Sequence, residues 1–229
     1  MIRIGGLALI SGAVAFMAVF AFLAARFDYP AVLDGSAEIV LPKLLATGAS
    51  GRAAWALYAF LPLIWIPAGV GAYLALRRSH PGAMLLALHS AALAAISMML
   101  GLIRWPSIHW RLAQEYVSAS PDQQRVLGSI FDGLNGYLGN YVGEFLGELS
   151  FSTFLLLSSW ALLRSRATRT WVASVGLLTG AAGLVGMFRN LTPAVAPVAA
   201  VNNYLLPVGM ILLGIVFYRY RTLEPIVST

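Results

Sequence analysis

The sequence predicts an all-α polytopic membrane protein, a bundle of six transmembrane helices with both termini in the cytoplasm. Hydrophobic residues make up 59% of the 229 residues and charged residues only 10%, and the mean hydropathy is +0.80. Soluble domains are about half apolar and about one quarter charged. A helix needs about 20 apolar residues to cross a bilayer. Six segments qualify, and we expect them to form one domain over 1–229: 4–25, 53–76, 83–103, 137–163, 171–188 and 199–218.

The connections between these helices predict the topology. Two short basic turns, 77–82 and 164–170, alternate with two long mixed segments, 26–52 and 104–136. Because short cytoplasmic loops carry an excess of arginine and lysine, we expect the basic turns inside and the long segments outside. Lys43 is the single lysine among 15 basic residues. Such a preference for arginine indicates a GC-rich bacterial source, so the expected location is the bacterial inner membrane.

The first helix, 4–25, resembles a secretory signal peptide in having Arg3 before its apolar run and small residues at its end. The run is longer than a typical signal-peptide core and five more spans follow, so we expect a retained helix. After it, Asp28-Tyr29-Pro30 predicts a turn and Ala37–Leu45 predicts a short amphipathic segment.

The second helix, 53–76, contains Pro62 and Pro67, and the sixth, 199–218, contains Pro207. Each proline removes a backbone donor, so we expect kinks at these positions. In the segment before the fourth helix, Ser120 is followed by Pro121 and Asp122, which is the pattern of a capped helix start. The fourth helix is therefore expected to begin outside the membrane.

Composition excludes several classes of function. The formal charge is +6, but the arginines are scattered along membrane flanks, so no nucleic-acid partner is expected. The absence of cysteine excludes disulfides, thiolate chemistry and iron–sulfur clusters. His80, His89 and His109 are too dispersed to form a metal or haem site. Lys43 lies in an external segment, which excludes a retinal Schiff base, and we expect no cofactor.

Glu144 and Glu148 are the only acidic residues inside a hydrophobic span. A carboxylate at the centre of a bilayer costs about 2.5–3.5 kcal/mol on insertion scales, so such residues normally face a bundle interior or a cavity. At 3.6 residues per turn, Asn140, Glu144, Glu148 and Ser152 fall on one stripe of the fourth helix. The glycines of this helix, 139, 143 and 147, predict close contact with a neighbouring helix.

Other polar and aromatic residues are expected at the outer end of the same bundle. Arg104 follows the third helix, Arg189 follows the fifth, and the sixth begins nearby. An arginine paired with either glutamate would reduce the cost of holding the charges in low dielectric. We predict an outward-opening polar pocket with these candidate ligand-binding residues: Arg104, Trp105, His109, Tyr137, Asn140, Tyr141, Glu144, Glu148, Arg189, Asn202 and Asn203. The opposing interpretation is a purely structural network that holds the six helices together without a ligand.

The order of features resembles the bacterial membrane proteins grouped as the domain of unknown function 4386 family. The resemblance is carried by Asp28-Tyr29-Pro30, by Gly101-Leu102-Ile103-Arg104-Trp105, by Tyr116, and by the Gly143-Glu144-x-Leu146-Gly147 run preceded by Tyr137 and Gly139. It covers nearly the whole chain and implies a six-helix integral membrane protein, with the activity left open. It also implies that Glu144 is the family-level residue and Glu148 is particular to this chain, with Phe145 standing where many members have histidine.

Three functions are compatible with these residues. The first is binding of a lipid or small amphiphile, with transport as an extension. The second is a cofactor-independent enzyme that uses Glu144 and Glu148 as an acid/base pair on a lipidic or isoprenoid substrate. The third is an accessory subunit of a larger membrane complex, with a protein partner or a second copy bound to an outer helix face. We expect membrane lipids as partners in every case.

Overall fold

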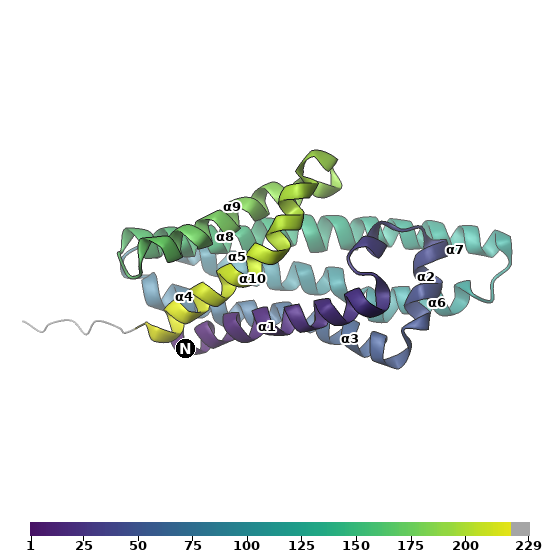
Figure 1. Ribbon diagram of the computed structural model, residues 1–229, viewed down its shortest axis with the longest axis horizontal. Coiled ribbons are helices and arrows are strands. Elements are labelled where there is room, and N and C mark those ends of the chain that lie inside the picture. Colours follow the sequence, from purple (N-terminus) through teal and green to yellow (C-terminus); the bar gives the residue numbers. More distant parts are fainter. Residues whose placement is uncertain (221–229) are drawn as a thin grey trace, which may run out of the picture.

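The computed structural model describes residues 1–220, and over this range the chain is helical with no strand (Figure 1). Six helical segments are long and apolar enough to cross a membrane, which confirms the predicted all-α bundle and its multi-pass character. All but the first contain two or more helical elements in succession, and each span is longer than the apolar run predicted for it. The segments are Ile2–Phe27, Gly48–Leu76, Pro81–Tyr116, Pro121–Arg164, Thr170–Asn190 and Pro193–Arg219.

The first, second, fifth and sixth segments are built as follows. Helix α1 spans Ile2–Phe27 without interruption. The second segment is α3 (Gly48–Phe60), a 3₁₀ turn η2 (Leu61–Ile64) and α4 (Trp65–Leu76). The fifth is α9 (Thr170–Gly186) with η5 (Met187–Asn190), and the sixth is η6 (Pro193–Val195) with α10 (Ala196–Arg219). The 3₁₀ turn contains Pro62, whose missing N–H is tolerated there.

The third and fourth segments extend far beyond the bilayer. The third joins α5 (Pro81–Ile103), a π-helical turn η3 (Trp105–His109) and α6 (Trp110–Tyr116). The fourth joins α7 (Pro121–Leu134), a π-helix η4 (Asn135–Leu146) and α8 (Gly147–Arg164). They contain 36 and 44 residues, or about 54 and 66 Å at about 1.5 Å per residue. The hydrocarbon core is only about 30 Å thick.

The expected long loop 104–136 is therefore helical except for a short turn around Ser118. The capped helix start predicted at Ser120 is confirmed. Its hydroxyl accepts a bond from the Gln123 N–H at 3.5 Å, and the Gln123 side chain accepts one from the Ser120 N–H at 2.9 Å. This reciprocal capping box starts α7 outside the predicted span.

The six segments form a closed ring in sequence order. Helix α1 packs against α4, α4 against α5, α5 against α8, α8 against α9, α9 against α10, and α10 returns to α1. The N-terminus, the two short basic turns and the end of α10 lie at one end of this ring (Figure 1). The Tyr220 hydroxyl donates to the Ala75 carbonyl at 2.8 Å, which ties the end of α10 to α4. Both described ends of the chain are thus on the same side, while the cytoplasmic orientation stays a prediction.

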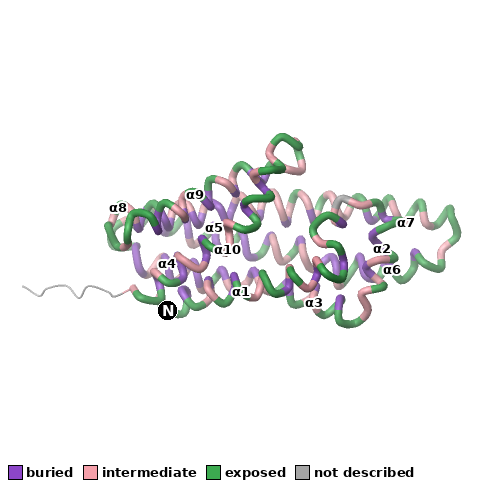
Figure 2. Tube along the Cα trace, in the orientation of Figure 1, coloured by how far each residue is buried: buried purple, intermediate pink, exposed green. Residues whose placement is uncertain are grey.

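Two buried cores stabilise the two ends of the bundle (Figure 2). The core near the N-terminus is made by small and aromatic residues of α1, α4, α5, α8 and α10. The other core joins the end of α1 to α2 (Ala37–Ala46), α3, α6 and α7, around the stacked rings of Trp55 and Trp105. The predicted turn is present here, because Asp28 ends α1 with a left-handed φ of 53° before η1 (Ala31–Asp34). The region between the two cores contains the candidate site.

Candidate functional site

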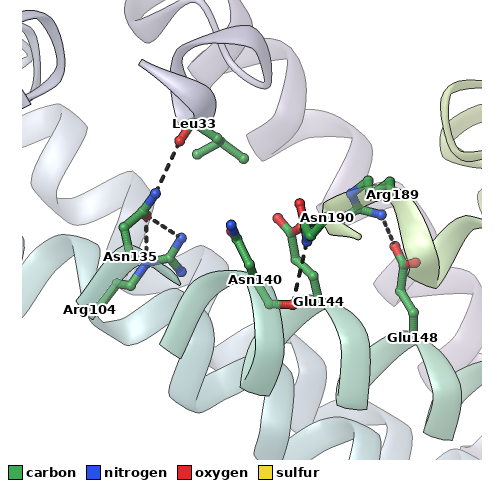
Figure 3. Close-up of polar contacts among 8 residues, drawn as sticks. All are labelled: Leu33, Arg104, Asn135, Asn140, Glu144, Glu148, Arg189 and Asn190. Carbon is green, nitrogen blue, oxygen red and sulfur yellow. Dashed lines mark hydrogen bonds and ion pairs between the residues drawn. The ribbon is translucent and has the colours of Figure 1, made fainter. Parts of the chain in front are cut away.

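Arg189 binds both intramembrane glutamates. Its Nη2 lies 2.9 Å from Glu144 Oε2, and its Nη1 lies 2.5 Å from Glu148 Oε1 (Figure 3). The arginine comes from η5 at the end of the fifth segment, whereas the two glutamates come from η4 and the start of α8. All three side chains are less than one third exposed, so the ion pairs are screened from water on most sides. The predicted pairing of an arginine with the glutamates is therefore present.

Asn190 adds a second link between the same two segments. Its Nδ2 donates to Glu144 Oε2 at 2.7 Å and reaches the Asn140 carbonyl at 3.5 Å. The carbonyl of Asn140 is within the π-helix η4, where i→i+5 bonding disturbs the regular ladder. One oxygen of Glu148, Oε2, is buried and has no hydrogen-bond partner among the described residues.

Arg104 lies apart from this cluster and does not form an ion pair with either glutamate. Its Nε and Nη2 donate to Asn135 Oδ1 at 3.3 and 3.0 Å, and its Nη1 donates to the Gly101 carbonyl. Asn135 in turn donates from Nδ2 to the Leu33 carbonyl at 3.1 Å (Figure 3). The guanidinium also lies 5.0 Å from the ring of Trp105, within the range of a cation–π contact.

A cavity of about 170 Å³ lies beside these charges. Its lining contains four charged residues, Arg104, Glu144, Glu148 and Arg189, which we call the charged wall and which come from the third, fourth and fifth segments. Helices α1 and α10 contribute no charged residue to the lining, and they supply the apolar residues Phe16, Met17, Phe20, Leu206, Pro207 and Met210. The cavity thus combines a charged surface with a hydrocarbon-like one.

Six of the eleven expected site residues line this cavity: Arg104, Trp105, Glu144, Glu148, Arg189 and Asn203. The other five lie elsewhere. His109 is fully buried between Trp105 and Phe131, and Asn202 is buried next to α9 at Gly183. Tyr137 and Tyr141 are exposed on the outside of η4, and Asn140 contributes its carbonyl to Asn190.

The projected stripe is only partly present in the cavity. Glu144 and Glu148 line the cavity and both reach Arg189, whereas Asn140 is not among the lining residues. Ser152 lies a turn further along α8 and faces α9, where a Cβ added at Gly183 would overlap its hydroxyl.

Three contributors were not identified from the sequence. Asn135 was missed because it lies in segment 104–136, which was interpreted as an external loop. Asn190 was missed because it is uncharged and follows the predicted fifth span, so its sequence context does not distinguish it. Tyr29 lines the cavity next to Tyr58, with ring centroids 6.0 Å apart. Burial raises the pKa of Tyr29, so its phenol stays neutral and can donate a hydrogen bond.

The fold defines a six-helix, multi-pass membrane protein, and the charged cavity lies inside its helical bundle. The chain belongs to the family described as Domain of unknown function (DUF4386), whose family model matches residues 4–221. The match covers nearly the whole chain and includes every cavity residue. Neither a curated protein nor a solved structure matches the chain.

Proposed function

We propose that this protein binds a lipid or a small amphiphile in the cavity between α1, α5, η4 and α10. The observation that carries the proposal is that the cavity is lined both by charged residues of the third, fourth and fifth segments and by apolar residues of α1 and α10. An amphiphile needs both surfaces, because its headgroup requires hydrogen-bonding partners and its chain requires an apolar environment. A network that only held helices together would not need an open space between its charges and the aromatic residues of α1.

In this proposal the cavity faces the outer side of a bacterial inner membrane. The support is the common position of the N-terminus and the two basic turns at the opposite end of the bundle, which the positive-inside rule assigns to the cytoplasm. Transport would follow if the bound amphiphile is released toward the other leaflet or a partner.

Native mass spectrometry of the protein extracted gently from its own membranes tests the proposal. We expect a discrete bound mass on the wild type whose affinity changes in Glu148→Gln, because this variant removes a charge from the cavity lining and weakens the contact with Arg189. Glu115→Gln is the matched control, since Glu115 is exposed on α6 and pairs with Arg111. A wild-type spectrum showing only the bare chain would contradict the proposal, and so would a bound mass of unchanged affinity in a folded Glu148→Gln protein.

An acid/base enzyme acting on a lipidic or isoprenoid substrate is the second candidate. The observation that favours it is that Glu144 and Glu148 both line the cavity, because a general acid or base must lie within reach of the bound substrate. The two candidates differ in the fate of the ligand. Recovery of an unaltered molecule after incubation with wild-type protein supports binding, whereas conversion that depends on Glu148 supports catalysis.

A further inference from the structure

Arg104 is a buried cation without a carboxylate partner. Arg104 is only 4% exposed, yet none of the ion pairs among the described residues includes it. Its three hydrogen bonds go to a side-chain amide and a backbone carbonyl, which are neutral acceptors. Arg189, by contrast, contacts two carboxylates. A buried charge is normally paired, so Arg104 is the cavity group with the greatest need of an anion.

The guanidinium has donors left for such an anion. An arginine carries one N–H on Nε and two on each Nη, and the contacts above use one on each nitrogen. One N–H on Nη1 and one on Nη2 therefore have no acceptor among the described residues. A pair of N–H groups on the two Nη atoms is the arrangement that binds carboxylate or phosphate. Glu144 is the carboxylate on the same wall, but Arg189 and Asn190 hold its Oε2.

The size of the cavity indicates how much of a ligand it can enclose. Its volume of about 170 Å³ is below the roughly 300–1,000 Å³ of pockets that enclose drug-sized molecules. A headgroup and the first carbons of a chain fit into such a space, and the remainder of a long chain must leave it.

The chain of such a ligand would leave the cavity between α1 and α10. These helices touch closely near the N-terminus, where a Cβ added at Gly6 would lie 2.6 Å from the Gly214 carbonyl oxygen. Further along they diverge, and α10 crosses away from α1 (Figure 1). The cavity is lined by both helices in this divergent part, and its rim residues Met17 and Asn203 are exposed. The cavity therefore opens sideways, toward the space that lipid chains occupy.

We propose that the ligand is an anionic single-chain amphiphile, whose carboxylate or phosphate binds Arg104 and whose chain leaves the cavity between α1 and α10. This inference rests on the proposed function and adds the charge of the ligand, its anchoring residue and its orientation.

Three probes with the same chain separate the headgroups: oleate, oleyl phosphate and oleyl alcohol. Each is titrated onto delipidated full-length protein in a neutral detergent, and bound mass is followed by native mass spectrometry. We expect wild type to bind oleate or oleyl phosphate at least about tenfold more tightly than oleyl alcohol, since a charged hydrogen bond is worth that factor or more. The preferred anion identifies the headgroup as carboxylate or phosphate.

Arg104→Gln should remove this preference, because glutamine is neutral but can still bond to neighbouring polar groups. Arg111→Gln is the matched control, because Arg111 is exposed on α6. If all three probes bind wild type equally and folded Arg104→Gln behaves in the same way, the anionic ligand is wrong but amphiphile binding stands. If none of the three binds delipidated wild type, both the inference and the proposed function fail.

Photolabelling tests where the hydrocarbon chain of the ligand lies. A fatty acid with a diazirine near the end of its chain is photolysed in complex with the protein, and the labelled peptides are mapped. We expect labels on the facing stretches of α1 and α10, near Met17 and Leu206, that excess oleate suppresses. Labels confined to other outer helix surfaces, or labels unaffected by oleate, would overturn the lateral exit.

Discussion

Gly139 provides the space that the guanidinium of Arg104 occupies. A Cβ added to this glycine would lie 2.7 Å from Arg104 Cζ and 3.1 Å from its Nε. The glycine belongs to η4 and the arginine follows α5, so the contact joins the third and fourth segments at the wall of the cavity. A side chain at position 139 would displace the arginine from its three hydrogen bonds.

Gly139→Ala should therefore destabilise the protein by about 1–3 kcal/mol, the usual effect of adding atoms to a packed site. Gly136→Ala is the matched control in the same π-helix, because its Cβ would meet nothing within 4 Å. That variant should be neutral or stabilised by up to about 1 kcal/mol through the higher helix propensity of alanine. Denaturant unfolding in detergent gives both values, and equal stability of the two variants would contradict the steric role of Gly139.

Asn135→Asp tests the unpaired charge of Arg104 from inside the protein. The new carboxylate would take the place of the amide that accepts from Nε and Nη2, and would act as an internal counter-ion. We expect oleate binding to weaken at least about tenfold, because the anion site is already satisfied. The Leu33 carbonyl loses its donor, at a cost of about 1–3 kcal/mol if it stays buried.

Ser129→Asp is the control for this experiment, since it adds the same charge at an exposed position of α7. Its oleate affinity should match that of the wild type. If folded Asn135→Asp binds oleate as tightly as Ser129→Asp, Arg104 is not the anion site.

The six spans were predictable because their apolar runs are long and the membrane requires them to be. The extension of the third and fourth segments was not, because their outer parts are mixed in polarity and owe their helical state to tertiary packing. Trp105, Trp110 and Phe131 bury their rings in the outer core, and a hydropathy window does not detect such contacts. Only the local capping pattern at Ser120 indicated that one helix starts there.

The pairing of Arg189 with the glutamates could be expected from their positions at the same end of two spans. The pairing of Arg104 with Asn135 could not be predicted, because it depends on how η4 packs along α5. Gly143 meets the backbone of Gly101, with an added Cβ only 2.9 Å from its Cα, and this close approach brings Asn135 to Arg104.

Ser120→Ala should loosen the first turn of α7. The capping box would lose the acceptor for the Gln123 N–H, and such a loss costs about 1 kcal/mol. Hydrogen exchange at the first-turn amides of α7 should accelerate about fivefold, while exchange in α8 stays unchanged. Ser118→Ala is the control, since the Ser118 hydroxyl bonds only to the Glu115 carbonyl outside this helix. Equal exchange in both variants would contradict the cap.

Arg189→Met should be the most damaging single change, because it leaves Glu144 and Glu148 without their cation. Removing one partner of a buried ion pair costs about 3–5 kcal/mol. Because these side chains are about one fifth exposed, we expect the lower part of that range. The exposed pair of Arg111 and Glu115 gives the comparison, and Arg111→Met should change stability by less than about 1 kcal/mol.

A triple variant distinguishes loss of the pair from loss of arginine packing. If uncompensated charge is the cause, adding Glu144→Gln and Glu148→Gln to Arg189→Met should restore most of the lost stability, because no carboxylate is then left without a partner. Unfolding of the single and triple variants in the same detergent makes the comparison. A triple variant as unstable as Arg189→Met would show that the arginine stabilises the protein through the packing of its side chain, and that the charges of the two glutamates contribute little to stability.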